Sequence, residues 1–267
     1  MEIYLDHAST TPLSEDVKKI IIENLNTFGN PSSLHRLGVI SEKNIKSSRA
    51  IICDALKIKE KELLFTSGGT EANNLAILGT ASKRLGRFIT SRIEHPSVLN
   101  AFETLAKAGH EVIYLDVDEW GIVDVKCLKE ALTLDTQLVS IMFVNNETGS
   151  IQPIAEIGGI IKDYNCDHQA RIKFHVDAVQ AFGKMPIGLD YLQIDLMSIS
   201  AHKINALKGT GALYVRESGT LKPLQYGGQQ EQGLRPGTEN LMGIIAFGEA
   251  VKHAVANMSR HYEHVAK

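Results

Sequence analysis

Short apolar runs rich in β-branched residues alternate along this chain with longer segments whose apolar residues recur every three or four positions. Parallel strands need a crossover, usually a helix, between them, so this alternation predicts an α/β fold with a mostly parallel, seven-stranded sheet covered by helices. The expected strands are residues 63–66, 87–90, 111–115, 138–144, 174–177, 196–200 and 211–215. The expected helices are residues 14–26, 39–56, 70–85, 96–108, 125–132, 154–164 and 243–267.

Composition limits the function classes that fit such a chain. A net charge of −3 over 267 residues gives no electrostatic basis for a nucleic-acid partner, and no apolar run is long enough to cross a bilayer. Cys53, Cys127 and Cys166 are far apart and form no C-x-x-C pair, which argues against a disulfide framework and a cysteine-rich metal site. The start of the chain has neither the basic nor the apolar part of a signal peptide. We therefore expect a cytoplasmic protein with no metal site and no membrane partner.

The sharpest local signal is Lys203, which follows a predicted buried strand in Ser198-Ile-Ser-Ala-His-Lys203. Lysines rarely sit in interiors unless they are paired or reactive. Burial favours the neutral amine, which attacks aldehydes, and the neighbouring Ser200 and His202 are donors that a phosphate would accept. Taken alone, the stretch is also explained by a surface loop with an unremarkable lysine.

Asp177 and the glycine turn Thr66-Ser-Gly-Gly-Thr70 also follow predicted strands. A carboxylate at the end of a buried strand is costly unless it has a partner, and a protonated pyridine nitrogen would be such a partner. Backbone N–H groups at a helix start, together with the Thr70 hydroxyl, form a phosphate cradle. The turn matches neither the Walker A pattern nor G-x-G-x-x-G, and a helix cap would explain Asp177 equally well.

Two further polar positions follow strands. His95, just before Pro96, could lie against a planar cofactor or exchange protons with a substrate, although a histidine that merely caps a helix is as simple an explanation. The amides of Asn145-Asn146 could bind a cofactor hydroxyl or a substrate carboxylate, or could form a plain turn.

In this order and spacing, the motifs resemble those of the cysteine desulfurases of the NifS/IscS type, in the pyridoxal-5′-phosphate (PLP)-dependent class V aminotransferase family. The resemblance covers essentially the whole chain. The matching segments are Tyr4–Pro12, Phe28–Ser33, Thr66–Glu71, Glu94–His95, Val144–Gly149, His175–Gln180, Ser200–Lys203, Gly227–Glu231 and Arg235–Asn240.

The resemblance implies a PLP fold-type I large domain and a role for each matched residue. Lys203 would hold PLP as a Schiff base and move a Cα proton, and His95 would stack on the ring, so that these two are the expected catalytic residues. Asp177 would pair with the pyridine nitrogen and Gln180 with the ring hydroxyl, while Asn146 would position L-cysteine. The phosphate would be held by Gly69, Thr70, Ser200, His202 and, reaching over from a second subunit of a homodimer, Thr238.

The same resemblance implies a domain plan and an activity. Residues 1–13 would form an arm, residues 14–242 the PLP-binding large domain, and residues 243–267 a helix leading to a small domain that is largely absent. The complete enzyme would convert L-cysteine to L-alanine and leave persulfide sulfur for iron–sulfur clusters or tRNA thiolation, with a sulfur-acceptor or scaffold protein as a partner. The alternatives are another class V activity (aminotransferase or selenocysteine lyase) and a non-catalytic PLP-binding or dimerisation module.

Two departures from the family pattern bear on activity. Ala206-Leu207 replaces the usual Gly-Pro of the loop after Lys203, which changes the backbone conformations open to that loop. The loop that carries the family's catalytic cysteine, and an arginine for the substrate carboxylate, cannot be matched, because all three cysteines come earlier in the chain. We therefore expect the 267-residue chain to bind PLP without turning over by itself.

Overall fold

A computed structural model describes residues 3–265. Within them the seven strands form one sheet in the order β1-β7-β6-β5-β4-β2-β3, in which only the pairings of β7 are antiparallel. The α/β class and the mostly parallel, seven-stranded sheet predicted from the sequence are thus confirmed. The strands are β1 (Leu63–Thr66), β2 (Arg87–Ser91), β3 (Glu111–Leu115), β4 (Thr136–Met142), β5 (Lys173–Asp177), β6 (Leu196–Ser200) and β7 (Gly211–Val215).

Seven α-helices are found in the described part of the chain, each overlapping a predicted one. They are α1 (Glu15–Asn24), α2 (Arg36–Leu56), α3 (Gly69–Thr80), α4 (Pro96–Lys107), α5 (Val125–Ala131), α6 (Ile154–His168) and α7 (Leu241–Val265). Short 3₁₀ turns occupy Glu60–Glu62, Ala201–Lys203, Ser218–Thr220 and Gln230–Gly233. None of the described helices is long and apolar enough to cross a membrane.

Several element boundaries differ from the sequence prediction, and three of the differences have local reasons. Helix α2 begins three residues earlier than expected because the ring of His35 accepts a hydrogen bond from the Gly38 N–H and caps it. Strand β4 ends at Met142, since Val144 instead bridges back to Ile151 beyond a turn. Helix α6 continues to His168 and stops where Gln169 adopts a left-handed conformation.

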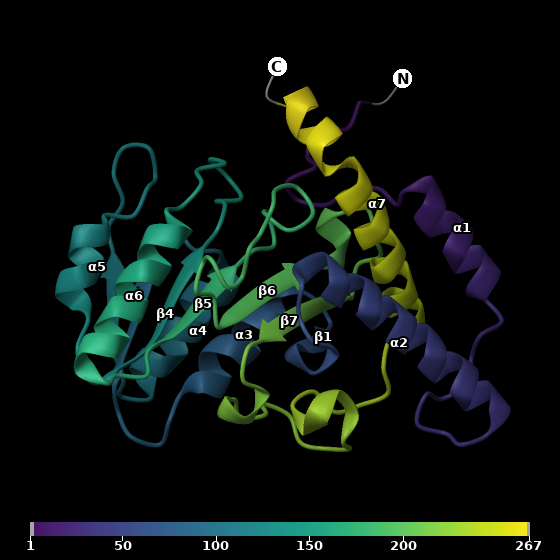
Figure 1. Ribbon diagram of the computed structural model, residues 1–267, viewed down its shortest axis with the longest axis horizontal. Coiled ribbons are helices and arrows are strands. Elements are labelled where there is room, and N and C mark those ends of the chain that lie inside the picture. The colour runs from purple at the N-terminus through teal and green to yellow at the C-terminus, as the bar shows by residue number, and fades with distance from the viewer. Residues whose placement is uncertain (1–2, 266–267) are drawn as a thin grey trace.

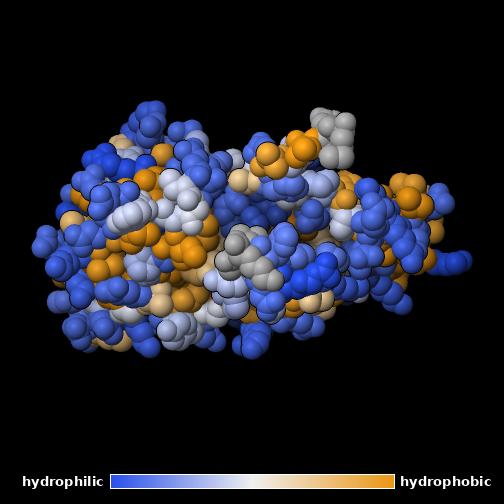
Figure 2. Space-filling view, turned by 90° about the horizontal axis from the view of Figure 1, so that it is seen from above, coloured by the Kyte–Doolittle hydropathy of each residue, from blue (hydrophilic) through white to orange (hydrophobic). Residues whose placement is uncertain are grey.

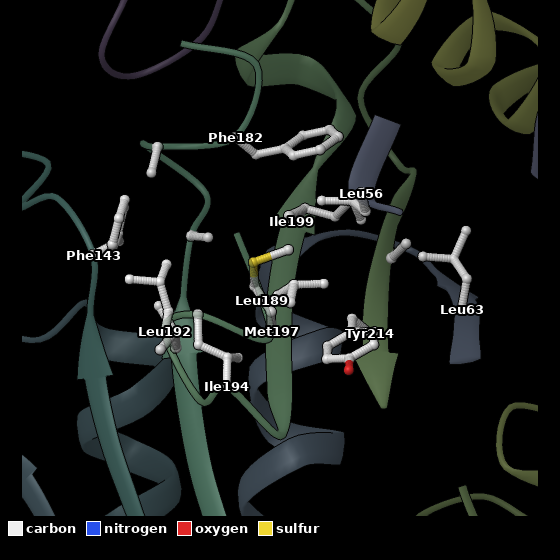
Figure 3. Packing of buried hydrophobic residues seen from close by; sticks show 14 of the residues in the cluster. Leu56, Leu63, Phe143, Phe182, Leu189, Leu192, Ile194, Met197, Ile199 and Tyr214 are labelled. Carbon is white, nitrogen blue, oxygen red and sulfur yellow. The ribbon is translucent and has the colours of Figure 1, made fainter. Parts of the chain in front are cut away.

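The sheet is the middle layer of three (Figure 1). Helices α3 and α4 cover one face, where their apolar residues pack on Leu64, Phe88 and Leu138. The other helices supply the apolar cluster on the opposite face, and Figure 3 shows Met197 and Ile199 of β6 in it. Alternate residues of each strand therefore serve two cores, which explains the nearly continuous apolar runs in the sequence.

Helix α7 packs along α2 and α1 (Figure 1). Its buried residues Ile244, Phe247 and Val251 are spaced by three or four, so they form one stripe. The loops that follow β1, β2, β4, β5 and β6 carry the polar motifs, and because these strands run in one direction, the motifs meet at one edge of the sheet.

Candidate functional site

A cleft of about 590 Å³ lies beyond the carboxyl ends of the parallel strands. Seen from above, the middle of this side of the molecule is recessed and hydrophilic (Figure 2). The structure brings every predicted site residue except Thr238 to this cleft. Those lining it are Gly69, Thr70, His95, Asn146, Asp177, Gln180, Ser200, His202 and Lys203.

Lys203 ends the 3₁₀ turn after β6, so its amine reaches the cleft rather than the sheet. Its Nζ donates hydrogen bonds to the carbonyl oxygens of Ala8 and Ser9. Burial lowers the pKa of Lys203, and the negative charges of Asp177 and Asp6 oppose that shift. A half-buried amine whose pKa is lowered is closer to the neutral form that reacts with carbonyl groups.

Asp177 is the last residue of β5, and its carboxylate is buried at the base of the cleft. Oδ1 accepts a hydrogen bond from the Val179 N–H (3.0 Å) and Oδ2 accepts one from Asn73 Nδ2 (2.7 Å). Burial raises the pKa of Asp177, while these hydrogen bonds and the nearby His95 and Lys203 lower it. The carboxylate therefore does cap a turn, as the simpler interpretation held, and it also faces the cleft.

The start of α3 forms a second wall, with Gly69 and Thr70 facing the cleft. The first N–H groups of a helix have no partner within it, so they can bind an anion. Small residues are required here: a Cβ on Gly69 would lie 2.8 Å from Val179 Cγ2, and one on Gly211 would lie 2.7 Å from the Gly68 Cα. Opposite lies Ser200, whose Oγ is buried without a hydrogen-bond partner in the described part of the chain.

His95 precedes α4 and caps it, because its Nδ1 accepts a hydrogen bond from the Ser97 N–H (3.1 Å). The ring also lines the cleft, so capping and cofactor contact are compatible.

The two asparagines after β4 have different structural roles. Asn145 builds the turn, since its Oδ1 accepts from the N–H groups of Glu147 and Thr148, whereas Asn146 lines the cleft.

Gln180 and His202 lie beside the segment before α1. Gln180 Nε2 donates to the Ala8 carbonyl (2.8 Å), and Lys184 Nζ donates to Gln180 Oε1 (2.7 Å). His202 Nδ1 lies 3.1 Å from Thr10 Oγ1, and burial lowers the pKa of His202, with further lowering by Lys203 and Lys208.

Sequence reasoning missed several residues of the cleft. Asp6, Ala8 and Ser9 line it, although the sequence predicts no site role for the arm. Asn73 and Ser97 also line it and are buried. The one available signal was a polar residue on the apolar side of a helix, because Asn73 lies three and four positions before Ala76 and Ile77, both of which are buried.

Thr238 and the cysteines lie outside the cleft. Thr238 is exposed in the loop before α7, which is held to α3 by an ion pair between Arg235 Nε and Glu71 Oε1 (2.9 Å). Cys53 is buried in α2, where burial raises the pKa of its thiol to about 12. Cys127 and Cys166 are exposed on α5 and α6.

The departure at Ala206-Leu207 leaves the loop after Lys203 without strain at these two positions. The left-handed residues of this loop are Asn205 (φ 67°) and Gly209 (φ 79°), which flank the substituted pair. Ala206 is buried, and its N–H donates to the Ala201 carbonyl. The chain thus keeps an ordered loop here without the glycine and proline.

Comparisons with known proteins agree with this geometry. The chain is 46% identical over 270 residues to the cysteine desulfurase IscS of Dictyoglomus turgidum, covering 100% of this chain and 67% of the relative. It is 45% identical to the enzyme of the same name from Methanosarcina thermophila, covering 96% and 63%. The chain thus spans about two thirds of the length of the curated relatives it matches.

Solved structures give the same assignment. A NifS-like protein matches with a TM-score of 0.93 and 37% identity, covering 97% of this chain and 71% of the other. A structure described as SspA in complex with cysteine matches with a TM-score of 0.89 and 41% identity, covering 94% and 73%. The class-V aminotransferase family matches residues 3–267. The chain therefore belongs to the class V aminotransferase family, whose members use PLP.

Proposed function

We propose that this chain is the cofactor-binding part of a PLP-dependent cysteine desulfurase, which converts L-cysteine to L-alanine and leaves persulfide sulfur for iron–sulfur clusters or tRNA thiolation. The observation that carries this proposal is the meeting of Lys203, Asp177 and the start of α3 in one cleft. The names of the relatives and the cysteine held by the SspA structure support desulfuration within the family.

The residues of the cleft fit PLP. The buried Ser200 hydroxyl lacks a partner in the described residues, and a phosphate oxygen beside the start of α3 would supply one. The buried Asp177 carboxylate needs a cation to offset its burial, which a protonated pyridine nitrogen provides. Lys203 is an amine of lowered pKa in the same cleft. Gly69, Thr70, Ser200 and His202 would hold the phosphate, Asp177 and Gln180 the ring, and Lys203 the aldehyde carbon.

When bound, PLP supplies an electron sink for the pair of electrons left by a broken bond at the substrate Cα. The chain's own residues do the rest. Asn73 and the Val179 N–H hold the two oxygens of Asp177, and this carboxylate would pair with the ring nitrogen and so maintain the sink. Lys203 and Asn146 line the same cleft, where the Lys203 amine would take and return a proton at Cα and Asn146 would orient the substrate.

Sulfur transfer requires a thiolate that can reach the substrate sulfur. None of the three cysteines lines the cleft, and Cys53 is buried with a strongly raised pKa. We therefore propose that residues 1–267 by themselves bind PLP and labilise a Cα proton but do not release sulfur from cysteine catalytically.

The proposal extends to assembly and domain plan. Residues 1–13 would serve as an arm, residues 14–242 as the large domain, and residues 243–267 as the connection to a small domain. In a homodimer, the exposed Thr238 would complete the partner's phosphate site. We expect the enzyme to be cytoplasmic and to pass its sulfur to a sulfur-acceptor or scaffold protein.

Covalent trapping tests the cofactor site directly. The protein is mixed with PLP, reduced with borohydride and digested, and mass spectrometry locates the adduct. We expect the adduct on Lys203, its loss in Lys203→Ala, and its retention in Lys126→Ala, a control at an exposed lysine of α5 that does not line the cleft. Absence of any adduct in the folded wild-type protein would overturn the proposal.

Reaction class is tested with PLP-loaded protein and a substrate panel. We expect exchange of the L-alanine Cα proton in heavy water to be faster than with free PLP and to be lost in Lys203→Ala. Alanine formation from L-cysteine should stay at the rate of free PLP. Formation of keto acid and pyridoxamine phosphate would instead support an aminotransferase, and preferential release of selenium from L-selenocysteine would support a selenocysteine lyase.

A further inference from the structure

A chain of hydrogen bonds at the cleft joins Asp177 to His95 through Asn73 and Ser97. The buried amide of Asn73 donates from Nδ2 to Asp177 Oδ2 (2.7 Å) and to Ser97 Oγ (2.9 Å). Both amide hydrogens are thereby used. The Asp177 carboxylate fixes this orientation, since the opposite one would place Asn73 Oδ1 against a carboxylate oxygen.

The direction of the Ser97 hydroxyl follows from the Asn73 amide. Ser97 Oγ accepts a hydrogen from Asn73, so its own hydrogen is free for His95 Nδ1, which lies 2.7 Å away. The Ser97 backbone N–H donates to the same nitrogen (3.1 Å). His95 Nδ1 therefore accepts two hydrogen bonds and can carry no proton without setting N–H against N–H. In the neutral ring the proton must be on Nε2.

We propose that Asn73 and Ser97 are positioning residues that hold His95 in its Nε2–H tautomer, so that the ring offers the cleft a hydrogen-bond donor and not a base. His95 Nδ1 accepts a hydrogen bond from the start of α4, which leaves Nε2 as the nitrogen available to a ligand. Such a donor fits an acceptor atom of a small amino acid, such as a carboxylate or thiolate. The identity of that ligand rests on the proposed function, whereas the tautomer does not.

The same network couples the two groups that would contact the cofactor ring, Asp177 at the ring nitrogen and His95 on the ring face. Asn73 uses one amide hydrogen to fix the Asp177 carboxylate and the other to orient the hydroxyl that fixes His95. The buried Asn73 side chain thus determines both the orientation of the Asp177 carboxylate and the tautomer of the His95 imidazole. Sequence spacing does not reveal this link, because Asn73, Ser97 and Asp177 come from α3, α4 and β5.

Nitrogen-15 NMR of histidine-labelled protein without PLP tests the tautomer. Long-range correlation spectra distinguish the Nε2–H form, the Nδ1–H form and the doubly protonated form, and His95→Gln identifies which of the ten histidines is His95. At pH 8 we expect a protonated-type Nε2 and an unprotonated, hydrogen-bonded Nδ1. A predominant Nδ1–H form would overturn the proposal. Because no cofactor is present, failure of PLP binding leaves this result unaffected.

Variants test the roles of the two positioning residues. Ser97→Ala and Asn73→Ala should shift the His95 Nδ1 resonance toward that of an imidazole nitrogen that accepts weaker hydrogen bonds. Ser97→Thr keeps a hydroxyl at this position, so the Nδ1 resonance should stay at its wild-type value. Ser140→Ala is the matched control, because Ser140 Oγ bonds His175 Nδ1 (2.8 Å) away from the cleft. It should move the His175 signals alone. A His95 spectrum unchanged in Ser97→Ala would contradict the proposed role of Ser97.

Discussion

Glu94 is a buried acid beside the cleft that plays no part in the proposed chemistry. Its side chain is buried with 4% of the residue exposed, and Oε1 accepts hydrogen bonds from Ser91 Oγ (2.6 Å) and the Met142 N–H (2.9 Å). Oε2 has no partner in residues 3–265. Burial raises the pKa of Glu94 to about 8, although its hydrogen bonds oppose the shift; the charge of Asp177 adds to it. At neutral pH Glu94 is therefore mainly protonated.

We predict that Glu94→Gln changes the pH dependence of stability. Because the pKa of Glu94 is higher in the folded than in the unfolded state, the stability it contributes is present below about pH 4.5 and is lost as the pH rises through 8. The stability of the wild-type protein relative to Glu94→Gln should fall between pH 5 and 8 by at most about 1.4 kcal/mol per pH unit. Urea unfolding across this range measures it.

The control for this prediction is Glu119→Gln, which removes an exposed carboxyl in a turn. Its stability should follow that of the wild-type protein at every pH. Parallel curves for the wild-type protein and Glu94→Gln would show that Glu94 is ionised in the folded state.

Helix α2 is tied to the loop after β7 by a buried ion pair. Arg49, 14% exposed in its side chain, pairs with Glu231, 4% exposed, at 2.6 Å. Arg49 also donates to the Leu63 carbonyl and lies over the Phe65 ring, while Glu231 accepts from the Phe65 N–H (2.9 Å). One pair therefore joins α2, β1 and the segment that leads to Thr238.

We predict that Arg49→Met destabilises the fold by about 3 kcal/mol, because it leaves a buried carboxylate without its cation. Urea unfolding measures the loss. The control is Arg84→Met, which breaks the exposed pair with Asp135 and should cost less than about 0.5 kcal/mol. Equal losses in the two variants would show that burial of the Arg49 pair contributes nothing.

A buried histidine joins three neighbouring strands, β4, β5 and β6, by hydrogen bonds. His175 of β5 lies between Ser140 of β4 (Nδ1 to Oγ, 2.8 Å) and Ser198 of β6 (Nε2 to Oγ, 3.0 Å). Burial lowers the pKa of His175 to about 3, so the ring is neutral in the folded protein except in strong acid. The ring bridges the strands on the same face as Asp177, two residues further along β5.

We predict that His175 contributes to acid unfolding. Its pKa is lower in the folded state, so the stability it contributes is present above about pH 6.5 and is lost as the pH falls toward 3. The stability advantage of wild type over His175→Gln should therefore shrink between pH 6.5 and 4 in urea titrations. His168→Gln, at an exposed site on α6, should show no such change. A constant advantage across this range would contradict the prediction.

At the scale of the whole molecule, α1, the segment after it and the start of α2 expose several large apolar side chains. Leu34 is 98% exposed, and other large apolar side chains near it in sequence are exposed as well. They are Ile22, Leu25, Phe28, Leu37 and Ile40. Exposed apolar side chains gathered in one stretch of the chain favour an association site, and a second copy of the chain is the occupant that the proposed homodimer supplies.

We predict that Leu34→Glu and Phe28→Glu shift the protein from dimer to monomer in sedimentation experiments, because each places a charge on the apolar face. Leu134→Glu, at a comparably exposed apolar residue between α5 and β4, should remain dimeric. Dissociation should also weaken PLP retention. A wild-type protein that is monomeric at micromolar concentration would contradict this prediction.

The sequence by itself determined the fold class, the positions of the strands and the family. Periodicity sufficed because buried parallel strands and amphipathic helices leave different apolar patterns, as in Leu196–Ser200 and Leu241–Val265. The motifs also placed Lys203, Asp177, Gly69 and His95 at strand ends, and the carboxyl ends of parallel strands meet at one edge.

Only the tertiary structure decided which polar groups act together. The link from Asp177 through Asn73 and Ser97 to His95 depends on directions of hydrogen bonds between α3, α4 and β5, which no spacing encodes. The pKa of Glu94 depends on burial, which its neighbours in sequence do not reveal. Strand and helix patterns arise from contacts local in the chain, whereas hydrogen-bond partners and desolvation arise from packing between distant segments, and that packing exists only in the folded molecule.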